Sequence, residues 1–387
     1  MSTARASFAT ILGLLSCVAC SGERPQPSGQ PTERAAAHWR PLRLAPAPSL
    51  DALLRTLETP AQTLALGATP LDVYPEIGRV IVYSANGDVT VLSDQDGRVV
   101  GARLPALPLT CRPTDVATDG RGNGCALMHC MMTAACSRVG AQGWTELPDL
   151  RDADGLSSAP GAIVAWRDAG EGAFAPTASA TSSPEAGKPG VEVIASGDGG
   201  RTWGRIAQTE TRARVVAVMA TTERDLVYVT GNGRTLLVQS GLPGEGGGGS
   251  FAPAQRVGAG LTELVAGNGL VGVATIRGYE LDFSWANPES ASARREHTIE
   301  LGAAPTAVAP WSDHALIVAV GRDLVGLELA DGRWGRSNGR IPLPAPAPDA
   351  AAGSPPPAAA AIVGVGRVGG AIAAVLADGN VLVFRGH

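Results

Sequence analysis

Short apolar runs, rich in β-branched residues, alternate along the chain with turn residues. Two such runs on either side of an Asn-Gly or Asp-Gly turn are a strong local signal for a β-hairpin. Five hairpins are predicted, at Val80–Leu92, Leu226–Val238, Leu270–Phe283, Leu316–Leu329 and Ile372–Phe384. Where no insertion intervenes, successive units are about 44 residues apart, close to the repeat length of a four-stranded sheet. The pattern therefore predicts an all-β protein built from repeated sheets.

Two more units fill the interval between the first and second of these hairpins. One runs through Cys125–Met128, and the other runs from Ile163–Trp166 to a hairpin that ends near Trp203. Counting all units gives about seven repeats, and six or eight remain alternatives.

The hairpin before Trp203 contains an eight-residue turn that reads Ser-x-Asp-x-Gly-x-Thr-Trp. Its glycines permit positive φ angles, which a tight turn needs. The side chains of Ser196 and Asp198 can accept hydrogen bonds from backbone N–H groups of the turn. Trp203 then places a large apolar side chain at the start of the next strand. These features predict a structural turn between two strands.

The five fixed positions of this turn are Ser196, Asp198, Gly200, Thr202 and Trp203, and they resemble the Asp-box of sialidase-type and other Asp-box β-propellers. The resemblance implies a turn between the third and fourth strands of a blade. It also implies a structural role for Asp198, since the motif supplies no second acid, base or nucleophile. We therefore predict a β-propeller of about seven four-stranded blades.

The last blade needs a strand from the N-terminal side of the chain. The C-terminal unit stops after its third strand, at Val381–Phe384, and an open edge would leave backbone groups unpaired. Trp39–Leu44 has the pattern of a fourth strand, and we predict that it closes the last blade. Ser49–Thr59 is predicted to be a helix that is capped by Ser49 and bridges to the first blade.

The N-terminus has the pattern of an export signal. Arg5 precedes the apolar run Phe8–Leu15, which is too short to span a bilayer as a helix. The following segment, Ser16–Gly22, resembles a bacterial lipobox, which implies lipidation of a cysteine. Cys20 is favoured because it leaves an even number of cysteines in the mature chain, and Cys17 is the alternative. An ordinary secretory signal is a further alternative.

These patterns divide the chain into three parts. We predict a lipoprotein signal peptide at 1–20, a flexible tether at 21–37 and a propeller domain at 38–387. Low-complexity insertions near 169–190, 241–250 and 342–358 are predicted to be disordered, because they offer little apolar surface to bury. The mature protein is expected in the cell envelope, anchored to a membrane and facing the periplasm or the cell surface.

The cysteines of an exported protein are expected to form disulfides in an oxidising compartment. Four cysteines lie close together in the sequence, Cys111, Cys125, Cys130 and Cys136. The rival interpretation is a metal site that includes His129, but it lacks a Cys-x-x-Cys pair and a second nearby imidazole. Four cysteines allow three pairings. The predicted strand order favours Cys111–Cys130 and Cys125–Cys136.

Composition and motifs argue against several functions. A net charge of −5 provides no basic face for nucleic acid, and 50 glycines with 29 prolines indicate many turns. The sequence has no His-Glu-x-x-His or phosphate-binding loop motif. A sialidase-like enzyme would need a tyrosine nucleophile with a glutamate partner and an arginine cluster, and no such pair can be assigned among Tyr74, Tyr83, Tyr228 and Tyr279.

We therefore predict a non-enzymatic binding or scaffold protein for an unknown protein or envelope ligand. No catalytic residue, metal or cofactor is predicted, and the protein is expected to be a monomer. The alternative is a sialidase-like glycoside hydrolase.

Overall fold

The computed structural model describes most of the chain beyond residue 46. Contacts divide the chain into Met1–Gln30 and Pro31–His387, and every described residue belongs to the second unit. The description covers residues 47–386 except 77, 129, 131–132, 148–149, 151–152, 160, 170–189, 211–213, 221–225, 232–235, 242–254, 259–262, 268–269, 278–279, 287–294, 304, 313, 331–332 and 344–360. Side chains are not described for 168–191 and 205–297. The predicted signal peptide, tether, lipidated cysteine and strand Trp39–Leu44 lie outside the described residues, as does nearly all of each predicted insertion.

The described strands form seven four-stranded antiparallel sheets. The first sheet has β2 (Pro70–Glu76), β3 (Arg79–Ser84), β4 (Val89–Gln95) and β5 (Arg98–Leu104), and the second has β6 (Asp115–Thr118), β7 (Asn123–Met128), β8 (Thr133–Arg138) and β9 (Thr145–Glu146). The third has β10 (Gly155–Ala159), β11 (Ala162–Ala169), β12 (Gly190–Ser196) and β13 (Gly204–Glu210), and the fourth has β14 (Arg214–Ala220), β15 (Leu226–Gly231), β16 (Leu236–Gly241) and β17 (Gln255–Gly258). The fifth has β18 (Glu263–Gly267), β19 (Leu270–Arg277), β20 (Glu280–Ala286) and β21 (Arg295–Glu300), and the sixth has β22 (Pro305–Ser312), β23 (Ala315–Val320), β24 (Asp323–Ala330) and β25 (Arg333–Pro342). The closing sheet has β1 (Gln62–Ala65) with β26 (Ile362–Val368), β27 (Ala371–Leu376) and β28 (Asn380–Phe384). All five predicted hairpins are present as pairs of adjacent strands.

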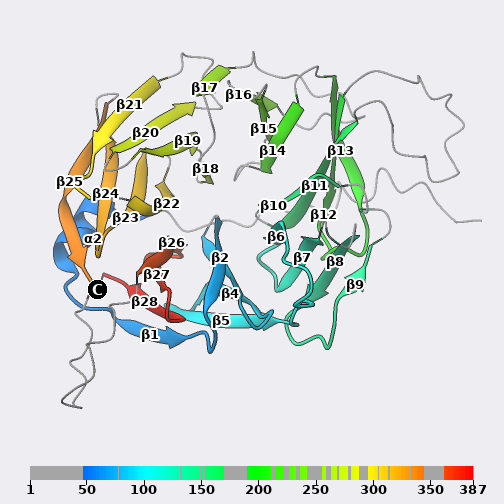
Figure 1. Cartoon of the computed structure of the whole chain (residues 1–387), viewed down its shortest axis with the longest axis horizontal. Helices are drawn as coiled ribbons and strands as arrows, with labels where there is room; N and C mark the ends of the chain where they lie inside the picture. The colour runs from blue at the N-terminus through cyan, green and yellow to red at the C-terminus, as the bar shows by residue number, and fades with distance from the viewer. Residues whose placement is uncertain are drawn as a thin grey trace, which may run out of the picture. The chain divides into compact units, whose positions relative to one another are not determined.

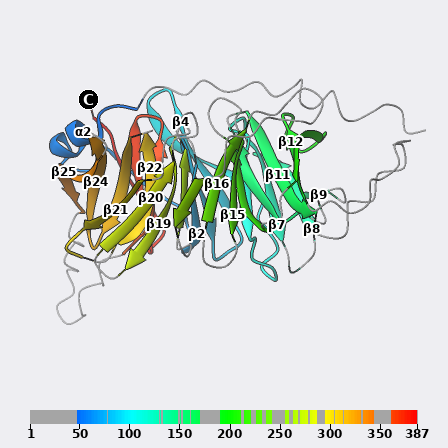
Figure 2. The same ribbon diagram turned by 90° about the horizontal axis from the view of Figure 1, so that it is seen from above.

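Successive sheets pack face to face around a common centre (Figures 1 and 2). The innermost strands are β2, β6, β10, β14, β18, β22 and β26. The core consists of apolar layers between neighbouring sheets. One layer joins the closing and first sheets through residues such as Val80 and Val375, and the next joins the first and second sheets through Ile81 and Val116. The strands read as nearly continuous apolar runs because both faces of each sheet are covered by neighbours.

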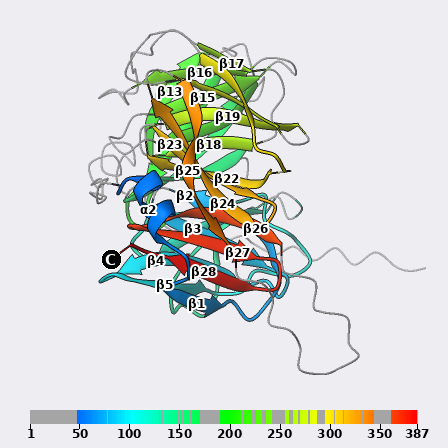
Figure 3. The same cartoon turned by 90° about the vertical axis from the view of Figure 1, so that its left-hand side faces the viewer.

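The closing sheet is completed by β1, whose residues Gln62–Ala65 pair with Asn380–Val383 of β28 (Figure 3). An N-terminal strand therefore closes the last sheet, as predicted, but the prediction that Trp39–Leu44 does so was wrong. The edge of β28 is occupied by residues only a few positions before β2, so a short link leads from the closing sheet into the first. The strand was missed because Gln62–Ala65 is short, alternates between exposed and half-buried positions, and lacks an aromatic residue.

The predicted helix is present as α2 (Leu50–Thr56), and Ser49 caps it by accepting a hydrogen bond from the Ala52 N–H at 3.3 Å. Leu50 and Leu54 are buried in the layer between the sixth and closing sheets. The helix therefore leads into β1 and covers the sixth sheet, instead of bridging to the first sheet as predicted. Among the described residues, no helix has the length and apolar character needed to cross a membrane.

The alternation of strand directions defines two ends of the sheets. We call top the end at which β2, β6 and β26 begin. There the Leu107 N–H, in the loop before β6, donates to the carbonyl of Gly87 in the β3–β4 turn at 2.8 Å. At the bottom, the Gly369 N–H of the β26–β27 turn donates to the carbonyl of Gly78 in the β2–β3 turn at 3.3 Å. Residues far apart in sequence therefore meet at each end.

Candidate functional site: the two ends of the first three sheets

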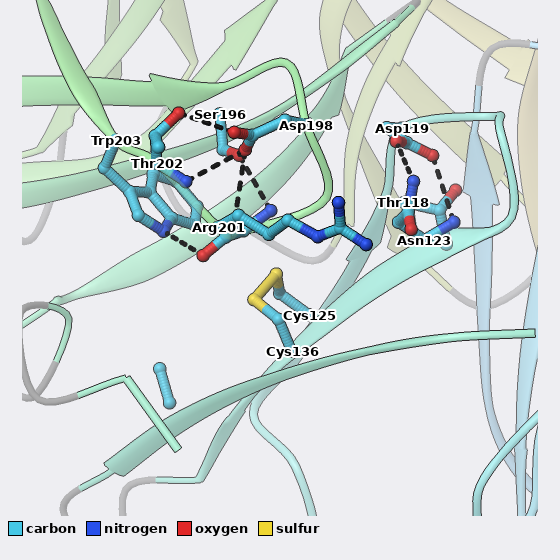
Figure 4. The surroundings of a disulfide bond; sticks show 12 residues. Thr118, Asp119, Asn123, Cys125, Cys136, Ser196, Asp198, Arg201, Thr202 and Trp203 are labelled. Atoms are coloured by element: carbon cyan, nitrogen blue, oxygen red, sulfur yellow. Dashed lines mark hydrogen bonds between the residues drawn. A yellow bond between two sulfur atoms is a disulfide. The ribbon is translucent and has the colours of Figure 1, made fainter. Parts of the chain in front are cut away.

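The turn Ser196–Trp203 joins β12 to β13 at the bottom and is held together by its own side chains (Figure 4). Asp198 accepts hydrogen bonds from the N–H groups of Arg201 (3.1 Å) and Thr202 (2.9 Å) and from the Thr202 hydroxyl (2.6 Å). The Ser196 hydroxyl donates to Asp198 at 2.8 Å and accepts from the Gly200 N–H at 2.7 Å. Trp203 Nε1–H donates to the Gly200 carbonyl at 3.1 Å. These contacts bring together all five residues of the predicted motif.

The environment of Asp198 explains its charge state. Partial burial alone would raise the pKa of this carboxyl, but the hydrogen bonds from Thr202, Ser196 and Arg201 outweigh it and lower the pKa. The carboxylate is therefore a stable acceptor for the turn. Its oxygens are used by the turn's own donors, which fits a structural role.

The same turn packs directly on the second sheet. Gly199 and Gly200 have φ angles of 74° and 88°, which favour glycine. A Cβ atom on Gly200 would lie 2.5 Å from Cys136 Sγ and 3.3 Å from Cys125 Sγ, and one on Gly199 would collide with the side chain of Asn123. The lack of side chains at these positions lets the third sheet contact the second closely.

A second turn with similar chemistry lies beside it, between β6 and β7. The buried Asp119 carboxylate accepts from the N–H groups of Arg121 (2.7 Å) and Asn123 (3.2 Å) and from the Asn123 amide (2.6 Å). The Gly161 N–H of the third sheet donates to the Asp119 carbonyl at 3.0 Å. The sequence analysis did not single out this turn, although its Asp-Gly dipeptide is a turn signal.

Both disulfides are present in the second sheet, with the pairing that the sequence favoured. Cys125 and Cys136 are directly opposite on β7 and β8 with their Cα atoms 4.0 Å apart, and both are buried. Cys111 and Cys130 join the loops before β6 and after β7 at the top, with Cα atoms 6.0 Å apart. His129 lies outside the described residues, and the described part of the chain contains no group of three or more potential metal ligands.

The junction of the first and second sheets is closed at the bottom by a buried ion pair. Glu76, at the end of β2, forms an ion pair with Arg79 (Nε to Oε2, 3.2 Å) and accepts a hydrogen bond from the Thr118 hydroxyl (3.0 Å). Burial raises the pKa of Glu76 to about 7, although the neighbouring Arg79 charge and the Thr118 hydrogen bonds act to lower it. Sequence analysis missed this group, since nothing local marks a glutamate as buried between two sheets.

The raised pKa of Glu76 predicts an unusual pH dependence. Because the folded state prefers the protonated carboxyl, its contribution to stability is complete below the unfolded pKa, near 4.5, and is lost as pH rises through about 7. The wild-type protein should therefore lose free energy of unfolding between pH 5 and pH 8. In Glu76→Gln this loss should be smaller by roughly 1–3 kcal/mol. Urea titrations at both pH values measure it, with the exposed Glu146→Gln as control. An unchanged difference in Glu76→Gln would contradict the assignment.

The top of the same junction carries a different set of groups. Arg112, in the loop before β6, forms a bidentate ion pair with Asp72 of β2. Tyr83 is buried in the apolar layer. The pKa of the half-buried Tyr74 is raised, mainly by burial and to a smaller extent by the negative charge of Asp72. A phenol that resists ionisation is a poor nucleophile, so neither tyrosine fits the sialidase role. The side chains of Tyr228 and Tyr279 lie outside the described residues.

Large apolar side chains are exposed mainly at the top. Leu109, in the loop before β6, is 67% exposed. Leu71 (46% exposed) and Val363 (39% exposed) are the second residues of the innermost strands β2 and β26. Val139, in the β8–β9 turn at the bottom, is 40% exposed. The top therefore holds three of the four exposed large apolar side chains among the described residues.

Comparisons with known proteins agree on the fold. No protein-family model matches the sequence, and a search of curated proteins gives no significant match. The structure of the RRP9 WD40 repeats aligns with a TM-score of 0.50 at 9% identity, over 85% of this chain and 99% of that chain. The domain is a β-propeller. Virginiamycin B lyase from Staphylococcus aureus aligns with a TM-score of 0.48 at 13% identity (84% and 98% covered), and YCF48 from Cyanidioschyzon merolae with 0.45 at 13% (84% and 99% covered).

In this propeller, each sheet is a blade, and the polar groups at the bottom join neighbouring blades. Glu76 and Thr118 connect the first blade to the second. The second and third blades are connected by the Gly161 N–H bond to the Asp119 carbonyl and by the packing of Gly200 on Cys136. At such low identities the similarity concerns the fold alone. The functional surface must therefore be inferred from the blades' exposed residues.

Proposed function

We propose that this propeller is a non-enzymatic binding protein that presents its top to a protein ligand. The observation that carries the proposal is the exposure of Leu71, next to Asp72, and of Leu109, in the loop whose Arg112 pairs with Asp72. Exposed apolar side chains with polar groups around them are the usual composition of a protein interface, with an apolar centre and a polar rim. Among the described residues at the bottom, Glu76, Thr118 and Asp119 hold neighbouring blades together, and their polar groups are used within the protein.

We also propose that the protein is a monomeric lipoprotein of the cell envelope, lipidated at Cys20. The lipobox-like segment supports this address, and so do two disulfides, which persist in oxidising compartments. The turn at Ser196–Trp203 then belongs to the Asp-box class, in which it stabilises a blade and takes no part in chemistry.

Site-specific photo-crosslinking in cells that export the full-length chain tests the proposal. A photoreactive residue at position 109 should give a discrete crosslinked protein band, whereas the same residue at position 139, exposed at the opposite end, should give none. Leu71→Ser should reduce the band from position 109 by tenfold or more, since truncating an interface anchor costs about 1–2 kcal/mol or more. In the same cells, palmitate label should be lost in Cys20→Ala.

Three results would count against the proposal. Equal crosslinking from positions 109 and 139 would place the contact elsewhere or show it to be non-specific. Palmitate label that persists in Cys20→Ala and is lost in Cys17→Ala would move the anchor to Cys17. Release of sialic acid from a sialoside by the purified chain would support the enzymatic alternative.

A further inference from the structure

The two disulfides of the second blade differ sharply in their surroundings. Cys125 is completely buried and Cys136 is 5% exposed, while Cys130 is exposed at the top. Cys111, the partner of Cys130, is buried in the layer between the first and second blades. One bridge is therefore enclosed on both sides, and the other has one sulfur-bearing residue at the surface.

The enclosed bridge is covered by the Ser196–Trp203 turn of the third blade (Figure 4). Gly200 lies so close to both sulfur atoms that even a methyl group on it would contact them. The turn is kept there by the hydrogen bonds to Asp198. A thiolate must reach a sulfur atom to attack it, so this turn protects Cys125–Cys136 while it stays in place.

We propose that Cys111–Cys130 is a site of thiol–disulfide exchange with dithiol reductants, and that Cys125–Cys136 is shielded from the same reaction. The proposal rests on the two disulfides and does not depend on the lipid anchor or on the protein ligand. It assigns different roles to the two bridges, with Cys125–Cys136 as a permanent link and Cys111–Cys130 as a reversible one.

The exchange is a two-step transfer. A thiolate of the dithiol attacks the sulfur of Cys130, the exposed residue of the bridge, the disulfide bond breaks, and Cys111 leaves as a thiolate that takes a proton from water. The second thiolate of the reagent then attacks the mixed disulfide and releases Cys130. The protein gains two electrons and two protons, and the dithiol becomes a disulfide. The Arg112 carbonyl oxygen lies 3.9 Å from Cys111 Sγ, where it can accept a hydrogen bond from the released thiol.

The surrounding contacts explain why the fold should survive this reaction. The loop before β6 stays attached through the Leu107 N–H bond to Gly87 and the Thr114 N–H bond to Leu127, both 2.8 Å, and through the Arg112–Asp72 ion pair. Reduction thus removes the covalent link between the loop after β7 and the loop that carries Leu109. It changes the top without opening the layers between blades.

Differential alkylation of the folded full-length chain tests the proposal. Free thiols are first blocked, dithiothreitol is then added without denaturant, and new thiols are alkylated with a second label and located by mass spectrometry. Labelling of Cys111 and Cys130 should be at least about tenfold faster than labelling of Cys125 and Cys136, because access limits the attack. Cys111→Ser/Cys130→Ser should still fold and should show only the slow phase.

A variant of the covering turn separates shielding from general unfolding. Asp198→Ala should speed reduction of Cys125–Cys136 several-fold and leave the rate at Cys111–Cys130 unchanged, because only the turn is loosened. Circular dichroism of the same samples shows whether the chain remains folded. Equal rates for the two bridges, or a rate at Cys111–Cys130 that follows global unfolding in urea, would overturn the proposal. An unchanged rate at Cys125–Cys136 in a folded Asp198→Ala chain would overturn the shielding.

Discussion

A chain that begins at Ala47 should unfold as cooperatively as the full-length protein, and a chain that begins at Gly67 should lose most of its stability. The second truncation removes β1 and α2. It leaves the edge of β28 unpaired and uncovers apolar residues of two blade junctions, among them Ile317 and Val381. Five buried leucines are also lost, namely Leu50, Leu53, Leu54, Leu57 and Leu66.

Burial of each such leucine contributes about 1.5–3 kcal/mol, so the total loss is expected to exceed roughly 5 kcal/mol. That is as large as the whole stability of many domains. Urea unfolding followed by circular dichroism and tryptophan fluorescence measures it. A peptide covering residues 47–66, added to the shorter chain, should restore the folded signal. The same peptide with Leu66→Asp should not, since Leu66 is buried in the apolar layer between the closing and first blades.

The comparison of the two truncations also decides which segment closes the ring. If Trp39–Leu44 were the closing strand, the chain that begins at Ala47 would be as unstable as the one that begins at Gly67. Such a result would contradict the pairing of Gln62–Ala65 with β28.

The substitution Gly200→Ala is expected to have the second largest effect. Its φ angle of 88° disfavours any side chain, and the new Cβ would meet Cys136 Sγ at 2.5 Å with no room to move. Left-handed strain and overpacking together predict a loss of about 2–4 kcal/mol. Thermal and urea unfolding measure this loss.

Gly140→Ala is the matched control. Gly140 also has a positive φ, of 77°, but nothing lies within 4 Å of the position of its Cβ. Only the backbone strain applies there, so a loss of about 1 kcal/mol is expected. If both variants lose the same amount, the close contact between the third and second blades contributes nothing to stability.

The sequence by itself predicted the features that depend on local pattern. Alternating apolar runs and turn residues located the hairpins, and the Ser196–Trp203 motif located a turn whose hydrogen bonds are made within eight residues. The helix after Ser49 followed from its cap and its leucines. In each case the deciding contacts are close in sequence, so the residues themselves carry the information.

The tertiary structure decided what depends on contacts between distant segments. Which short strand completes the closing sheet depends on the register of β1 with β28, more than 300 residues later, and an aromatic residue at Trp39 was a misleading guide. The burial of Glu76 beside Arg79 and Thr118, and the covering of Cys125–Cys136 by Gly200, likewise arise only where two blades meet. The free energy of such contacts comes from burial and desolvation, which no local pattern of residues reveals.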